Sequence, residues 1–222
     1  ILSKNKNIGV LIMEVVRNEK PKKSYLKKII EICKMNRVIV IFDECTSGFR
    51  ETFGGIHLKY KINPDIAVFG KALGNGYAIT AIIGKKTVMK HCEDSFLSST
   101  FWSERIGPTA ALATLEEMER TQSWKKISKI GKYIKREIYK LSKKNKVKIK
   151  FQGIDSLINF NFISEANEVL KKTIVYEMLK NGFLTKNLIY VSLDLKENII
   201  KKYLFYLNKT FEKIYIIDRY KY

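Results

Sequence analysis

The stretch that decides the fold is Gly9-Val-Leu-Ile-Met-Glu-Val-Val16, a short and mainly apolar run. Such a run is typical of a strand buried within a sheet. Pro21 then opens a segment in which apolar side chains recur at helical spacing up to about Asn36. A second β-branched run, residues 38–42, follows at once. Strand, helix and strand in this order predict two parallel strands joined by a right-handed crossover.

More elements follow along the chain. Residues 66–69 predict a third strand, which ends at Gly70-Lys71 before a glycine-rich loop, and residues 78–84 predict a fourth. Later helices are expected at residues 108–120, 124–143, 165–181 and 197–214, and later strands at 147–151, 157–162 and 188–193. We therefore expect an α/β domain over residues 1–120 and a smaller α+β domain over residues 121–222.

Composition narrows the class of protein. Hydrophobic residues make up 45% of the 222 residues, which is enough to bury a core, and no apolar run is long enough to predict a transmembrane helix. The three cysteines, Cys33, Cys45 and Cys92, fit neither a zinc site nor a disulfide framework. His57 and His91 fit no metal spacing either, and we expect both to be surface or packing residues. We expect a cytoplasmic protein with no metal and no membrane partner.

The formal charge of +20 raises the question of nucleic-acid binding. Most of the positive charge comes from lysines, which are spread along the chain on the polar faces of predicted helices. Arginine, the residue favoured for bidentate phosphate and base contacts, is scarce. The pattern favours a solvated basic surface and no nucleic-acid partner, and a basic binding module stays as an alternative.

Two ionisable residues follow predicted parallel strands. Asp43 comes after residues 38–42, and Lys71 comes after residues 66–69. Ligands bind at the carboxyl ends of such strands. Pyridoxal phosphate (PLP) chemistry needs both residue types: an amine that bonds to the cofactor aldehyde, and a carboxylate beside the pyridine nitrogen. The freed lysine can then move a proton as a general base. Either residue alone also fits a structural role, a turn-forming aspartate or a solvated lysine.

Two longer phrases surround these residues. They are Val40-Ile-Phe-Asp-Glu-Cys-Thr-Ser-Gly-Phe-Arg50 and Pro64-Asp-Ile-Ala-Val-Phe-Gly-Lys-Ala-Leu-Gly-Asn-Gly-Tyr77. They resemble the cofactor-aspartate and Schiff-base-lysine motifs of class III aminotransferases, in the same order and with similar spacing. Gly48-Phe-Arg50 and Phe53-Gly-Gly55 resemble the branch that contains glutamate-1-semialdehyde aminomutase. The resemblance covers at least residues 9–116 and continues more faintly to the end of the chain.

The resemblance implies a PLP-dependent transferase of fold type I, with part of the large parallel-sheet domain followed by the small α+β domain. Lys71 would bond to PLP, and Asp43 would pair with the pyridine nitrogen. Thr100 would bind the cofactor phosphate of a neighbouring subunit, which implies a homodimer. Thr46 stands where many members place a glutamine near the phenolic oxygen of the cofactor. Glu14 matches a glutamate that ends a family strand, and we interpret it as structural.

The implied activity is transfer of an amino group from a small-molecule donor to an aldehyde or ketone acceptor. Residues 101–108 differ from the Leu-Ser-Gly-Asn-Pro phrase expected of an aminomutase, so an aminotransferase is preferred. A 2,1-aminomutase stays as an alternative, and so does an inactive fragment. The sequence does not name the substrate.

The chain begins with Ile1 and enters a predicted strand almost at once. The family's phosphate-cradling Ser/Gly/Thr loop and its ring-stacking aromatic both precede the region that resembles this chain. We therefore expect an N-terminally truncated fragment that is inactive and poorly soluble by itself.

Overall fold

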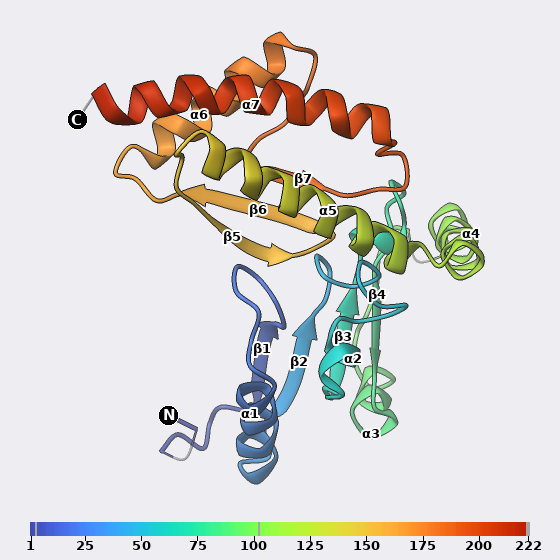
Figure 1. The fold of residues 1–222 in the computed structure, drawn as a ribbon. Helices are drawn as coiled ribbons and strands as arrows, with labels where there is room; N and C mark the ends of the chain where they lie inside the picture. The colour runs from blue at the N-terminus through green and yellow to red at the C-terminus, as the bar shows by residue number, and fades with distance from the viewer. Residues whose placement is uncertain (3, 102, 221–222) are drawn as a thin grey trace. The chain divides into compact units, whose positions relative to one another are not determined.

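The structure, a computed structural model, describes residues 1–2, 4–101 and 103–220. Two compact units make up the chain, Ile1–Trp124 and Lys125–Tyr222. Each unit contains one β-sheet, of four strands in the first unit and three in the second (Figure 1). No helix in the described ranges is both long enough and apolar enough to cross a membrane.

The first unit is built on the predicted strand–helix–strand motif. Strand β1 (Val10–Glu14) leads through helix α1 (Lys23–Met35) to strand β2 (Ile39–Asp43), which pairs with β1 in parallel. Strand β3 (Ile66–Phe69) adds to β2, also in parallel. The parallel motif expected from residues 9–42 is confirmed. Asp65 ties the start of β3 to β2, because its Oδ2 accepts a hydrogen bond of 2.8 Å from the Val40 amide.

The fourth strand reverses the direction of the sheet. Strand β4 (Ala81–Gly84) is antiparallel to β3 and begins three residues later than the strand expected from residue 78. The connection, residues 70–80, is shorter than the dozen or so residues that a parallel crossover needs. It turns tightly at Gly74, where an added Cβ would lie 2.2 Å from the carbonyl oxygen of Tyr77. The sheet is therefore mixed.

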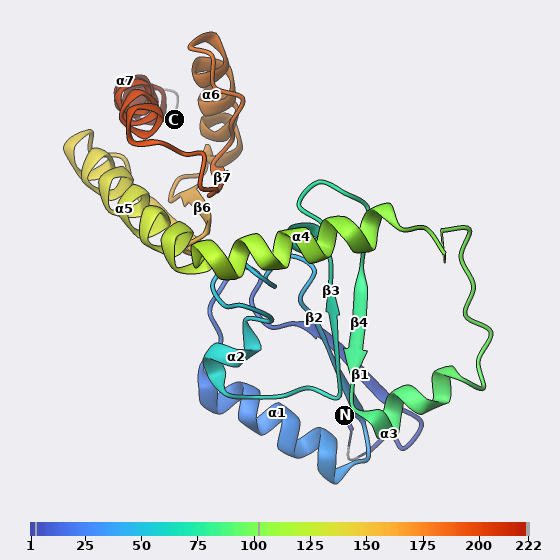
Figure 2. The same cartoon turned by 90° about the vertical axis from the view of Figure 1, so that its right-hand side faces the viewer.

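Three further helices and two short 3-10 helices belong to this unit. The helices are α2 (His57–Tyr60), α3 (Lys86–Met89) and α4 (Ile106–Thr121), and the 3-10 helices are Lys71–Leu73 and Lys90–Cys92. Helix α1 packs on β2. Figure 2 shows the ribbon of α4 crossing near the upper ends of β3 and β4. Ala111 of α4 lies in an apolar cluster with Ala67 and Phe69 of β3.

The two faces of the four-stranded sheet differ. Val40 and Phe42 alternate with half-buried neighbours and are fully or almost fully buried on one face. On the other face Val10, Ile12 and Ile82 are each more than half exposed. The register places Glu14, Asp43, Val68 and Ile82 in one row across the strands, on that exposed face. The open face of the sheet thus carries Asp43.

The second unit is a three-stranded antiparallel sheet with its helices on one face (Figure 1). Its helices are α5 (Ser123–Lys144), which starts at the end of the first unit, α6 (Asn167–Lys180) and α7 (Glu197–Tyr220), and its strands are β5 (Ile149–Ile154), β6 (Leu157–Phe162) and β7 (Leu188–Tyr190). Strand β6 alternates strictly, so that Ile158, Phe160 and Phe162 enter the core while the residues between them stay half-buried.

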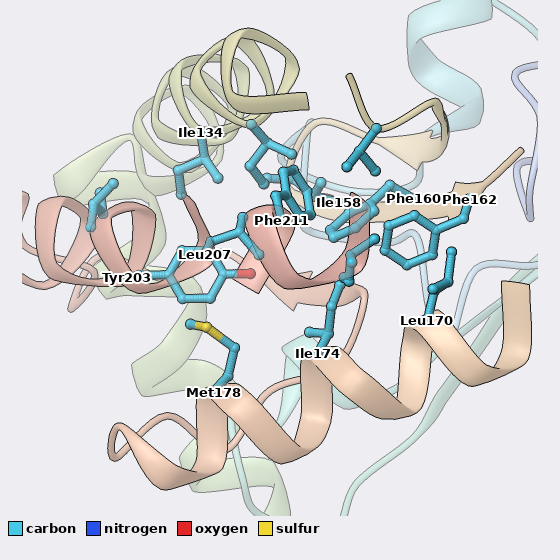
Figure 3. Close-up of a cluster of buried hydrophobic side chains, with 14 of the residues drawn as sticks. Ile134, Ile158, Phe160, Phe162, Leu170, Ile174, Met178, Tyr203, Leu207 and Phe211 are labelled. Carbon is cyan, nitrogen blue, oxygen red and sulfur yellow. The ribbon is translucent and has the colours of Figure 1, made fainter. Parts of the chain in front are cut away.

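That core joins all three helices to β6. Phe160 meets Phe162 and Phe211 edge to face, with ring centroids 6.0 and 6.3 Å apart (Figure 3). Further members come from each helix: Ile134 and Ile138 of α5, Leu170, Ile174 and Met178 of α6, and Leu207 and Ile214 of α7. The helices expected at residues 124–143, 165–181 and 197–214 are therefore present, and each contributes apolar side chains to this core.

Replacing Phe160 with alanine should lower the free energy of unfolding by about 3–5 kcal/mol, because its fully buried ring would leave a cavity. The same change at Phe205, which is 56% exposed on α7, should cost less than about 1 kcal/mol. Denaturant unfolding followed by circular dichroism measures both. Equal losses for the two variants would contradict this description of the core.

Candidate functional site

The candidate site lies where strands β2 and β3 end. Asp43 is the last residue of β2 and pairs across the sheet with Val68, and Lys71 follows β3 after Gly70. Because the two strands run in parallel, the chain leaves both at the same edge of the sheet. The structure therefore brings Asp43 and Lys71 to one place.

Lys71 has an uncommon backbone conformation. Its φ of 44° lies in the left-handed region, which side-chain-bearing residues seldom adopt, and it starts a 3-10 helix. The hydrogen bond from the Asn75 amide to the Lys71 carbonyl, at 3.1 Å, stabilises this turn. The side chain is exposed, and its Nζ donates a hydrogen bond of 3.0 Å to Thr46 Oγ1. The lysine amine is thus accessible to solvent and is held by its hydrogen bond to Thr46.

Asp43 organises the turn that follows β2. Its Oδ1 accepts a hydrogen bond of 3.0 Å from the Cys45 amide, as turn-forming aspartates commonly do. Burial raises the pKa of the Cys45 thiol, and the hydrogen bond and charge of Asp43 raise it further. The positive charge of Lys71 acts in the opposite direction, and Glu14 adds a small increase. The thiol therefore lies within the field of all three charged residues.

Glu44 forms a buried network that the sequence did not indicate. Its carboxylate is fully buried and accepts hydrogen bonds from Ser47, from the amides of Ile56 and His57, and from the His57 ring. His57 was expected to be a surface or packing residue, and it is a buried packing residue. No spacing or periodicity links positions 44 and 57, so only a three-dimensional structure could reveal the pair.

The other expected residues lie apart from this contact. Thr100 is exposed in the loop before α4, and in the described part of the chain no contact joins it to Asp43 or Lys71. Its expected role involves a neighbouring subunit and stays a prediction. Glu14 forms an ion pair of 2.7 Å with Arg17, in keeping with a structural role. Among residues 1–2, 4–101 and 103–220, no group of three or more His, Cys, Asp and Glu side chains is placed to hold a metal ion.

Comparison with known sequences identifies the family. The aminotransferase class III family model matches residues 2–196. The 3-aminobutyryl-CoA aminotransferase of Cloacimonas acidaminovorans is 33% identical over 180 residues, which cover 78% of this chain and 44% of that protein. The glutamate-1-semialdehyde 2,1-aminomutase of Methanocaldococcus jannaschii is 31% identical over 77% of this chain and 39% of its own length. The chain belongs to the class III aminotransferase family, and it spans less than half the length of these relatives.

Solved structures agree on the fold. Acetylornithine aminotransferase from Elizabethkingia anophelis superposes with a TM-score of 0.82 and 25% identity, over 96% of this chain and 59% of that one. The PLP internal aldimine form of the Sphingopyxis sp. MTA144 FumI protein gives a TM-score of 0.90 at 17% identity, over 97% of this chain and 54% of that one. The second likeness bears on the fold alone. The chain has the α/β fold of the PLP-dependent transferases of fold type I.

The Cys45 thiol can report on the two charged residues beside it. Asp43→Asn removes groups that raise the pKa of Cys45, so alkylation by iodoacetamide at mildly alkaline pH should become faster. Lys71→Met removes the charge that lowers this pKa, so alkylation should become slower. Mass spectrometry of the Cys45 peptide, with the Cys92 peptide as internal standard, measures both rates. Unchanged rates in both variants would mean that Asp43 and Lys71 do not lie close to Cys45.

Proposed function

We propose that this chain provides the cofactor-anchoring lysine and aspartate of a PLP-dependent aminotransferase. The observation that carries the proposal is the placement of Asp43 and Lys71 at the carboxyl ends of two parallel strands, β2 and β3. The reaction would move an amino group from a small-molecule donor to an aldehyde or ketone acceptor. Membership of the class III aminotransferase family supports this reaction class. Because this chain spans less than half the length of its relatives, the complete reaction is proposed for a longer protein that includes these residues.

The residues at the site fit the cofactor by their chemistry. When bound, PLP supplies an aldehyde that an amine can attack and a ring that withdraws electrons from a carbon losing a proton. Lys71 offers an accessible primary amine, and Asp43 offers a carboxylate for the protonated ring nitrogen. Thr46 and Thr100 offer hydroxyls, the first for the phenolic oxygen of the cofactor and the second for the phosphate of a neighbouring subunit.

Each side chain has a separate task in this proposal. The Lys71 nitrogen would hold the cofactor. When free, it would act as a general base, taking a proton from the substrate carbon and delivering it to another atom of the reacting molecule. The Asp43 carboxylate would pair with the ring nitrogen and favour the form in which that nitrogen carries a proton. Thr46 holds the Lys71 amine at 3.0 Å when the amine carries no other partner.

The wider organisation follows from the same proposal. The first unit, Ile1–Trp124, would be part of the large cofactor-binding domain expected at residues 1–120, and the second, Lys125–Tyr222, the small domain expected at residues 121–222. A role of Thr100 toward a neighbouring subunit calls for a homodimer. The three cysteines are free thiols, which supports a cytoplasmic location.

A second candidate is a 2,1-aminomutase, which moves an amine between adjacent carbons of one molecule. It is favoured by the similarity to the Methanocaldococcus jannaschii aminomutase, nearly as high as that to the aminotransferase relative. The two differ in their need for an acceptor. We expect the chain, supplied with the part of the Cloacimonas acidaminovorans relative that it does not match, to transfer nitrogen only when a carbonyl acceptor is added. Turnover without any acceptor would favour the aminomutase.

The cofactor lysine can be tested on the chain itself. Incubation with PLP followed by borohydride, which makes the bond between lysine and cofactor permanent, should label Lys71 ahead of the other lysines. Lys71→Ala should abolish this selective label, while Lys85→Ala should keep it, because Lys85 is an exposed lysine paired with Asp65 at the start of β3, the opposite end of that strand from Lys71. Peptide mapping by mass spectrometry gives the label at each position.

Equal labelling of many surface lysines, unchanged in Lys71→Ala, would contradict the proposed site. Salt-sensitive binding to DNA in that case would favour the basic binding module instead. The chain alone is expected to show the label without catalytic turnover.

A further inference from the structure

The first unit contains a carboxylate that is buried where burial is costly. Glu44 follows Asp43 and has no exposed surface. An ionised carboxylate in such a place is stable only when hydrogen-bond donors surround it. Glu44 has four: Oε1 accepts from the His57 amide at 3.0 Å and from His57 Nδ1 at 2.9 Å, and Oε2 accepts from the Ile56 amide at 2.9 Å and from Ser47 Oγ at 2.5 Å.

These bonds join two segments that are distant in sequence. The Glu44 side chain binds the start of α2 at Ile56 and His57, while its own amide donates to the Val68 carbonyl of β3 at 2.8 Å. Glycines allow the close approach. A Cβ on Gly55 would lie 2.3 Å from the His57 ring, and one on Gly48 would lie 2.7 Å from both the Glu44 carbonyl and the Phe69 ring. Residue 44 is therefore held from both sides.

The turn that Glu44 holds carries Thr46. The turn is short, since the Gly48 amide bonds back to the Glu44 carbonyl at 2.7 Å. The Thr46 carbonyl accepts a hydrogen bond of 2.7 Å from Arg50 Nε, and its hydroxyl accepts from the Lys71 amine at 3.0 Å. We propose that Glu44 is a positioning residue, whose buried carboxylate fixes this turn and so holds the Thr46 hydroxyl against the Lys71 amine.

A catalytic interpretation of the same cluster is disfavoured by its geometry. Ser47, Glu44 and His57 lie together, but the Ser47 hydroxyl donates to the carboxylate and not to the imidazole. A nucleophilic serine needs its base within hydrogen-bond reach and needs access to substrate. The Ser47 hydroxyl is bonded to Glu44 and not to the imidazole, and at 3% exposed it is closed to substrate. The cluster acts through the backbone that it orders.

Any effect of Glu44 on cofactor binding rests on the proposed function, but the hydrogen bond between Thr46 and Lys71 does not. The reactivity of the Lys71 amine can be measured without cofactor, by competitive acetylation of the 222-residue chain with acetic anhydride and mass spectrometry of the Lys71 peptide. A hydrogen bond to Thr46 must break before the amine attacks the reagent. Thr46→Val should therefore raise the Lys71 rate about twofold to tenfold, the range for one hydrogen bond, and Thr46→Ser should not.

Glu44→Gln tests the positioning role. Each carboxylate oxygen accepts one backbone amide, from His57 or from Ile56, so the NH₂ of a glutamine faces a backbone donor in either orientation. The turn should loosen and raise the Lys71 rate as much as Thr46→Val does. The double variant should add nothing further, because both changes remove the same contact. Asp155→Asn, which disturbs a 3.0 Å ion pair with Lys135 in the second unit, should leave the Lys71 rate unchanged.

All rates are compared at a temperature where circular dichroism shows each variant folded. If Glu44→Gln does not fold, Ser47→Ala, which removes one of the four donors, should still raise the Lys71 rate, by a smaller factor. A folded Glu44→Gln variant with the unchanged rate would overturn the proposal, and so would additive effects in the double variant. Failure of PLP to label Lys71 would instead contradict the proposed function and leave this result standing.

Discussion

The parallel pairing of β2 with β3 is the constraint on which the candidate site depends. With Asp43 opposite Val68, the chain leaves both strands at one edge of the sheet, and Asp43 and Lys71 arrive there from distant parts of the sequence. An antiparallel pairing would have sent them to opposite edges. Asp65 reinforces this arrangement by tying the start of β3 to the Val40 amide. Burial raises the pKa of Asp65. The hydrogen bonds from Lys85 and the Val40 amide, together with the Lys85 charge, lower it by more, so the pKa lies below its usual value.

Two unfavourable features lie next to each other at this edge. Lys71 adopts a left-handed backbone conformation, and the carboxyl group of Glu44 is fully buried. Each persists only because neighbouring groups compensate for it. For Glu44 the compensation is four hydrogen bonds, two of them from backbone amides that belong to the start of α2. The second unit, by contrast, is organised around one large apolar cluster.

The relatives show how one scaffold serves more than one reaction. One is named for transfer between two molecules and another for migration of an amine within one molecule, yet both match this chain to a similar extent. In the proposed function, the amine and the carboxylate at the strand ends would supply the anchoring common to both reactions, and the choice of substrate would depend on other residues.

The sequence by itself determined the longer helices, the approximate places of the strands, the parallel motif and the two residues at the strand ends, but not the short helices α2 and α3. Apolar periodicity depends on which side chains are buried, and that pattern is local. It also carried the family resemblance, because the phrases around Asp43 and Lys71 are continuous. The tertiary structure alone decided the reversed β4, the contact between Thr46 and Lys71, and the burial of Glu44 against His57. These features depend on loop length and on hydrogen bonds between segments separated in the chain, and no periodic pattern records such contacts.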